Sequence, residues 1–72
     1  MSPNEKRVLK IIKERGRANA VTIRSQVGIT VEYADYLCKG LLSQGYLEVD
    51  HSVKSRHRAY RLSARGEDML LL

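Results

Sequence analysis

The chain has 72 residues and a formal net charge of +5. A chain of this length forms one domain (residues 1–72) that buries only about 60% of the surface exposed when unfolded, which disfavours a large enclosed active site. Its 43% hydrophobic and 29% charged residues are typical of a folded domain. No apolar run approaches the roughly 20 residues that span a bilayer, and no signal-peptide pattern opens the sequence, so we expect a cytoplasmic protein without a membrane partner.

The basic charge is concentrated in two segments. Residues 1–17 contain six basic and two acidic side chains, and residues 51–72 contain five basic and two acidic ones. The residues between them have two basic and four acidic side chains, and so a net charge of −2. Clustered basic charge favours a polyanionic partner. Cys38 is the only cysteine, which excludes an intrachain disulfide and a multi-cysteine metal site.

The first predicted helix begins after Ser2 and ends near Arg15. Ser2 can cap it, Glu5 can complete a capping box, and Gly16 can end it. The apolar residues that share one face at helical spacing are Val8, Ile11 and Ile12. The opposite face is basic, and we interpret it as an ordinary solvated face: Lys6, Lys10 and Lys13.

Two further helices are predicted on either side of a tight turn. Asn19 can cap the second, which Gly28 ends, and Thr30 can cap the third, which Gly45 ends. The apolar face of the third helix is formed by Ala34, Leu37, Cys38 and Leu41. The opposite face is formed by Glu32, Tyr36, Lys39 and Ser43. The spacing of these two helices is that of a helix-turn-helix unit.

From Tyr46 onward the periodicity of apolar residues changes to 2, which predicts a β-hairpin. The positions predicted to face the core are Leu47, Val49, Tyr60 and Leu62. The alternating positions predicted to face solvent are Glu48, Asp50, Ala59 and Arg61. A polar, basic loop over residues 52–57 connects the two strands. Ser63 can cap a final short helix, which we expect to continue through residues 69–72.

The predicted fold class is therefore mainly α with a small β-hairpin (α+β). Two segments carry a family resemblance. In the first, the turn Gly28-Ile29-Thr30 precedes a helix followed by Gly45-Tyr46-Leu47; in the second, Arg56 precedes a hydrophobic strand, Leu62-Ser63 and Gly66. These features resemble the winged helix-turn-helix superfamily. The sequence is most similar to small archaeal and bacterial single-domain regulators and to the DNA-binding core of MarR-type repressors.

The resemblance implies a three-helix core with a wing and a short C-terminal helix. It also implies that the third helix enters the major groove of duplex DNA, while the wing reaches the backbone or minor groove. The wing-tip residue would be Arg56, and the recognition surface would comprise Thr30, Val31, Glu32, Tyr33 and Tyr36. The sequence departs from the family in the acidity of this helix, which carries Glu32 and Asp35. A carboxylate can accept from cytosine N4, but phosphates repel it.

Several exposed side chains have two interpretations. Tyr33 and Tyr36 either contact DNA or form, with Asp35, a docking patch for a protein partner. The wing cations either clamp phosphates or belong to a solvated hairpin tip: Lys54, Arg56 and Arg58. We predict a DNA-binding transcriptional regulator that uses these cations and Lys39. The alternative is a winged-helix module for protein–protein interaction without sequence-specific DNA binding.

Neither catalysis nor a bound metal or cofactor is expected. Cys38 lies on an apolar face, and His51 and His57 lack a third ligand at useful spacing. The sequence contains no catalytic triad, carboxylate pair or nucleotide fingerprint. A homodimer is expected, because one helical face can bury only about two of the four consecutive apolar residues that form the expected interface: Met69, Leu70, Leu71 and Leu72.

Overall fold

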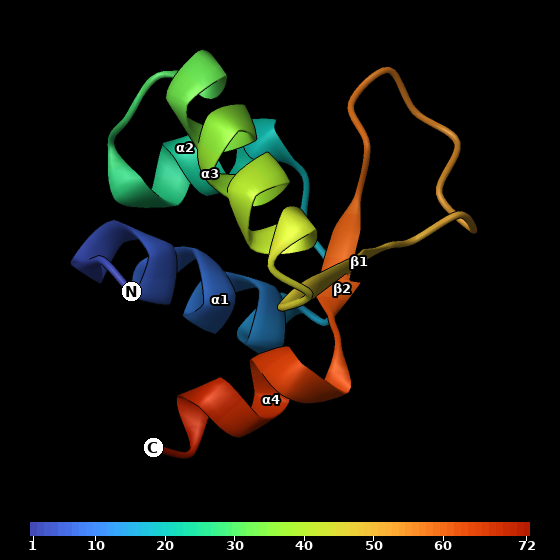
Figure 1. Cartoon of the computed structure of the whole chain (residues 1–72). Helices are drawn as coiled ribbons and strands as arrows, with labels where there is room; N and C mark the ends of the chain where they lie inside the picture. The colour runs from blue at the N-terminus through green and yellow to red at the C-terminus, as the bar shows by residue number, and fades with distance from the viewer.

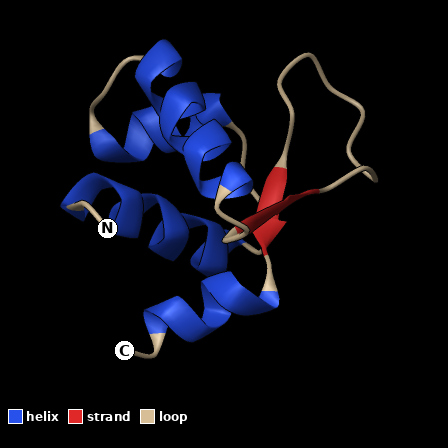
Figure 2. Cartoon of the chain, in the orientation of Figure 1, coloured by secondary structure: helices blue, strands red, loops and turns tan.

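Four helices and one antiparallel hairpin follow one another in the predicted order. The computed structural model describes residues 1–72. The elements are α1 (Pro3–Arg15), α2 (Ala20–Val27), α3 (Val31–Ser43), β1 (Leu47–Val49), β2 (Tyr60–Leu62) and α4 (Ala64–Leu70). In Figure 1, α1, α2 and α3 pack together, α4 lies beside α1, and a long loop extends from the hairpin. Figure 2 shows the same division into a helical body and a small sheet, which confirms the predicted α+β class.

The helices begin at the predicted caps. The side chain of Ser2 accepts a hydrogen bond from the Glu5 amide, and Glu5 Oε1 accepts one from the Ser2 amide at 2.9 Å, which completes the capping box. The same kind of side-chain acceptor begins the other three helices: Asn19, Thr30 and Ser63. Each cap satisfies an amide that has no partner within its helix.

The core lies between α1, α2, α3 and the hairpin. The predicted apolar face of α3 is confirmed, since Ala34, Leu37, Cys38 and Leu41 are all buried. In α1, Leu9 is buried and Ile11 is only half-buried, so its buried face is rotated relative to the predicted one. Burial raises the pKa of the Cys38 thiol to about 12. The thiol therefore stays protonated and unreactive, as expected of a residue in the apolar core.

The hairpin pairs Leu47 with Leu62 and Val49 with Tyr60. A further pair of hydrogen bonds joins Tyr60 to Ala18, at 2.8 and 3.0 Å, so the connection between α1 and α2 adds to the edge of the sheet. The prediction that Asp50 and Ala59 face solvent is wrong, because they are 7% and 4% exposed. Both lie just outside the three-residue strands, where regular alternation no longer applies.

Helix α4 ends earlier than predicted. Met69 and Leu70 are half-buried against the core, whereas Leu71 and Leu72 lie beyond the helix and are 81% and 95% exposed. An ion pair between Lys13 and Glu67, at 2.5 Å, joins α4 to α1. None of the four helices combines the length and the apolar character needed to cross a membrane.

Candidate nucleic-acid interface

The turn between α2 and α3 presents one face of α3 to solvent. Gly28 ends α2 in the left-handed conformation (φ 77°), and its amide donates to the Arg24 carbonyl at 2.9 Å. Glycine adopts this φ without strain. Thr30 then begins α3 by accepting from the Tyr33 amide at 3.1 Å. The side chains along the outward face of α3 are exposed: Glu32, Tyr36, Lys39 and Ser43.

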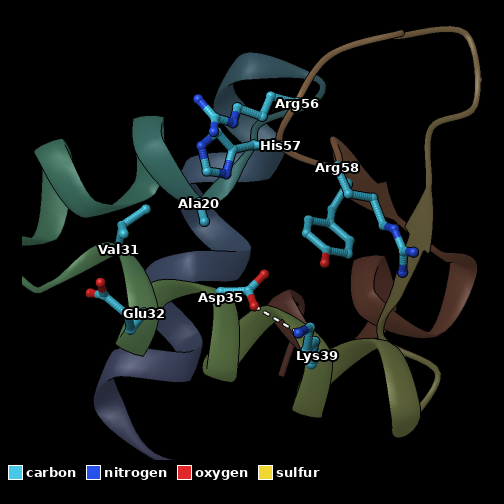
Figure 3. A pocket seen from close by; sticks show the side chains of 9 residues that line it. Ala20, Val31, Glu32, Asp35, Lys39, Arg56, His57 and Arg58 are labelled. Carbon is cyan, nitrogen blue, oxygen red and sulfur yellow. Dashed lines mark ion pairs between the residues drawn. The ribbon is translucent and has the colours of Figure 1, made fainter.

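A groove of about 390 Å³ separates this helix from the loop that joins β1 to β2, which corresponds to the predicted wing. Its α3 wall carries Glu32, Asp35 and Lys39, and its wing wall carries Arg56 and Arg58 (Figure 3). Two arginines of the wing therefore face a wall that carries two carboxylates and one lysine. Of the predicted recognition residues, Val31 and Glu32 line this groove together with the predicted wing arginines, whereas Thr30, Tyr33 and Tyr36 do not. The charged side chains of the groove give it a net positive charge.

The two carboxylates of the groove are not equivalent. Asp35 forms an ion pair with Lys39 at 2.9 Å, one helical turn away. The hydrogen bond and negative charge of Asp35 raise the pKa of Lys39. Glu32 takes part in none of the four ion pairs and accepts no side-chain hydrogen bond. It lies in the first turn of α3, where a negative charge is favourably placed against the helix dipole.

The two exposed tyrosines of α3 lie outside this groove. Their rings stack with centroids 6.2 Å apart and an interplanar angle of 15°. Tyr33 is 41% and Tyr36 70% exposed, and both line a separate depression beside Ser2 and Glu5 of the α1 start. The stacked pair therefore lies on the side of α3 next to the start of α1, with Tyr36 the more exposed of the two.

The wing cations share a second hollow within the loop. Lys54 lines it together with Arg56 and Arg58, which also line the groove facing α3. His57 lines the groove as well, although it is not among the predicted DNA-binding residues. Its position between Arg56 and Arg58 in the sequence could have indicated that it belongs to this surface. No three His, Cys, Asp or Glu side chains lie close enough together to hold a metal ion.

Asp50 anchors the wing, a role that the sequence did not predict. Its Oδ1 accepts hydrogen bonds from the amide and hydroxyl of Ser52, at 3.0 and 2.5 Å. Its Oδ2 lies 3.6 Å from a guanidinium nitrogen of Arg17. The bonds from Ser52, together with the charge of Arg17, lower the pKa of Asp50. The carboxylate therefore joins the start of the wing to the connection between α1 and α2.

Asp50→Asn is expected to lower the stability of the domain at neutral pH and to flatten its dependence on pH. Because the folded-state pKa of Asp50 is lowered, its stabilisation is present above the ordinary aspartate pKa and is lost as the pH falls through the lowered value. Urea unfolding at several acidic pH values measures this. The control is Glu48→Gln, which removes an exposed carboxylate paired with Arg61 at 3.0 Å. Equal pH profiles for the two variants would contradict the assignment.

The comparisons with known proteins identify the fold. No protein-family model matches the chain, and no curated protein matches its sequence. Among solved structures, YusO from Bacillus subtilis superposes with a TM-score of 0.90 at 17% identity, and RV1404 from Mycobacterium tuberculosis with 0.89 at 19%. A mutant MarR from E. coli, complexed with operator DNA, gives 0.85 at 16%. The chain has a MarR-type winged-helix fold.

Each of these three alignments covers 99% of this chain. The winged-helix chain spans about half the length of the solved structures it matches, between 49% and 51%. At this level of identity the likeness establishes the fold. In winged-helix terms, α3 is the second helix of the helix-turn-helix unit, the loop between β1 and β2 is the wing, and the groove between them is lined by side chains of both.

Proposed function

We propose that this chain is a DNA-binding transcriptional regulator that binds duplex DNA and catalyses no reaction. The observation that carries the proposal is the groove in which the exposed face of α3 meets Arg56 and Arg58 of the wing. The proposal is supported by the E. coli MarR bound to operator DNA, which shares the fold over 99% of this chain. A regulator of this kind acts where the DNA is, and we assign it to the cytoplasm.

The proposed contacts divide between the helix and the wing. Helix α3 lies in the major groove, with contacts from its start and outward face: Thr30, Val31, Glu32, Tyr33, Tyr36 and Lys39. The wing contacts the phosphate backbone or the minor groove through Lys54, Arg56 and Arg58. The wing carries no carboxylate between residues 51 and 59. The wing therefore supplies most of the affinity, and α3 supplies the contacts to bases.

The salt dependence of duplex binding tests this function. Binding of a labelled random-sequence duplex is measured by fluorescence anisotropy between 50 and 200 mM salt, the range in which counterion release is readily observed. If the three wing cations each neutralise one phosphate, log affinity falls linearly with log salt with a slope of about −2.7. Absence of duplex binding, or binding that is insensitive to salt, would contradict the function.

A protein-binding module is the second candidate function. It is favoured by the exposed, stacked pair Tyr33 and Tyr36, because aromatic residues are enriched in protein interfaces. Asp35 lies beside this pair in sequence, but its carboxylate is already held by Lys39. The salt slope of duplex binding by the unaltered chain distinguishes the two candidates, because a protein-binding module shows no such slope. Tyr36→Ala leaves the wing cations in place, so it is expected to keep that slope if the wing carries the DNA affinity.

We further propose that the regulator is a homodimer, with the interface at residues 69–72. Leu71 and Leu72 are largely exposed beside a shallow depression lined by Lys10, Lys13 and Leu70. Full burial of one large apolar side chain stabilises by about 1.5 to 3 kcal/mol, so a symmetric pair of such segments supports association. A two-fold dimer also suits a palindromic site, with two α3 helices about 34 Å apart.

Leu71→Ser combined with Leu72→Ser is expected to shift the dimer toward monomer. Both side chains are exposed, so their replacement leaves the packing of Met69 and Leu70 on the core intact. Sedimentation at micromolar concentration measures the association. Thermal unfolding of the dissociated variant checks that each subunit still folds. The proposal fails if the unaltered chain sediments as a monomer, or if the double variant remains as dimeric as the parent.

A further inference from the structure

We propose that Glu32 determines the sequence specificity of α3 by accepting a hydrogen bond from the N4 amino group of a cytosine. The inference rests on the proposed function, since it requires α3 to lie in the major groove. It assigns a base to a single side chain, which duplex binding alone does not do.

The position of Glu32 places it toward base edges. In helix-turn-helix proteins the first residues of the recognition helix contact the bases. Thr30 uses its hydroxyl oxygen to cap α3, and Val31 is half-buried against the core. Glu32 is therefore the first side chain of α3 that is both exposed and charged. In Figure 3 its carboxylate extends from the start of α3, away from the Asp35–Lys39 pair.

The carboxylate of Glu32 is also free to accept. Asp35, the other carboxylate on this helix, is held by Lys39 at 2.9 Å. Glu32 forms no ion pair and receives no hydrogen bond to its side chain within the protein. The cations Arg56, Arg58 and Lys39 line the same groove, so the charge of the groove attracts DNA despite this carboxylate.

The chemistry of the major groove then selects cytosine. Guanine presents only the acceptors N7 and O6 there, and thymine presents the acceptor O4, so both repel a carboxylate. Adenine presents the N6 donor beside the N7 acceptor, and N7 would repel the second oxygen of the carboxylate. Cytosine presents its N4 donor with no acceptor of its own in the groove. An acceptor-only side chain therefore matches cytosine best.

Glu32→Gln changes this match predictably. The amide of glutamine offers one donor and one acceptor, which is the arrangement that pairs with adenine N6 and N7. The substitution is close to isosteric at an exposed position, so the fold is retained. We expect the preferred base to change from cytosine to adenine at one position of each half-site, while binding to other sequences persists.

Selection from a random duplex library tests the assignment. The chain and two variants, Glu32→Gln and the matched control Glu48→Gln, are selected at two salt concentrations. Glu48→Gln also removes one exposed carboxylate, but outside the groove. The parent is expected to enrich a cytosine that Glu48→Gln retains and that Glu32→Gln replaces with adenine. On single duplexes, the parent is expected to prefer cytosine over thymine at that position about tenfold. Glu32→Ala is expected to lose this preference.

The alternative outcomes separate the two proposals. A parent that binds duplexes without an enriched cytosine, a Glu32→Gln variant that keeps the same cytosine, or a Glu48→Gln variant that loses it would each overturn the role of Glu32. The proposed function would still stand in these cases. Failure of every form to bind any duplex at low salt would overturn both.

Discussion

Gly66→Ala is expected to destabilise the domain by about 3 kcal/mol, because the added methyl group has no space. A Cβ at Gly66 would lie 2.2 Å from the carbonyl oxygen of Tyr46 and 3.3 Å from Leu62 Cδ2. The first neighbour is a backbone atom in the turn before β1, which a rotamer change cannot move. Relief therefore requires α4 to move away, and that movement separates Met69 and Leu70 from the core.

The helical preference of alanine opposes this effect but is smaller, about 1 kcal/mol. Gly40→Ala is the matched control, since Gly40 lies within α3 and has nothing within 4 Å of its added Cβ. It is expected to stabilise by about 0.5 to 1 kcal/mol. Urea unfolding of both variants measures whether each substitution lowers or raises the free energy of unfolding. A Gly66→Ala variant with the same unfolding midpoint as the parent would show that the turn absorbs the methyl group.

The positions of the helices could be predicted because their signals are local. The caps Ser2, Asn19, Thr30 and Ser63 lie within three residues of the amides they satisfy. The apolar face of α3 repeats at helical spacing from Ala34 to Leu41, about two turns, which is long enough to define which side is buried. The three-residue strands are too short for their alternation to predict which side the neighbouring residues face. The predicted exposure of Asp50 and Ala59, just beyond the strand ends, is wrong for this reason.

Features that depend on distant parts of the chain were not predictable in this way. The pairing of Ala18 with Tyr60 involves one residue on each side and so leaves no periodic pattern. The approach of Asp50 to Arg17 depends on how the wing leaves the sheet. Gly66 was recognised through a family resemblance, but the reason for a glycine there appears only in its distance from the Tyr46 carbonyl.

The proposed interface was predictable in composition but not in arrangement. The basic residues of the wing and the mixed charge of α3 are both evident along the sequence. Their meeting in one groove follows from the packing of the hairpin beside α3. The pairing of Asp35 with Lys39 is local, because the two residues lie four positions apart on α3. The helical repeat predicts Tyr33 and Tyr36 on neighbouring faces, but only the structure shows that both line a depression beside the start of α1.

Lys54→Ala combined with Arg56→Ala is expected to weaken binding to every duplex sequence alike. Both cations belong to the exposed wing, where neither forms an ion pair with the protein. If each neutralises one phosphate, the salt slope becomes shallower by about 1.8. The same counterion term corresponds to about 30-fold weaker binding at 0.15 M salt. Anisotropy titrations over a range of salt concentrations measure both quantities.

The matched control is Lys6→Ala combined with Arg15→Ala on α1, two exposed cations that line neither the groove nor the depression beside the proposed dimer interface. It lowers the net charge of the chain by the same two units but leaves the wing intact. If DNA affinity resides in the wing, the α1 variant keeps the slope of the parent while the wing variant does not. An equal loss of slope in both would mean that net charge, rather than the position of the wing, determines binding. An unchanged slope in the wing variant would remove the wing from the interface.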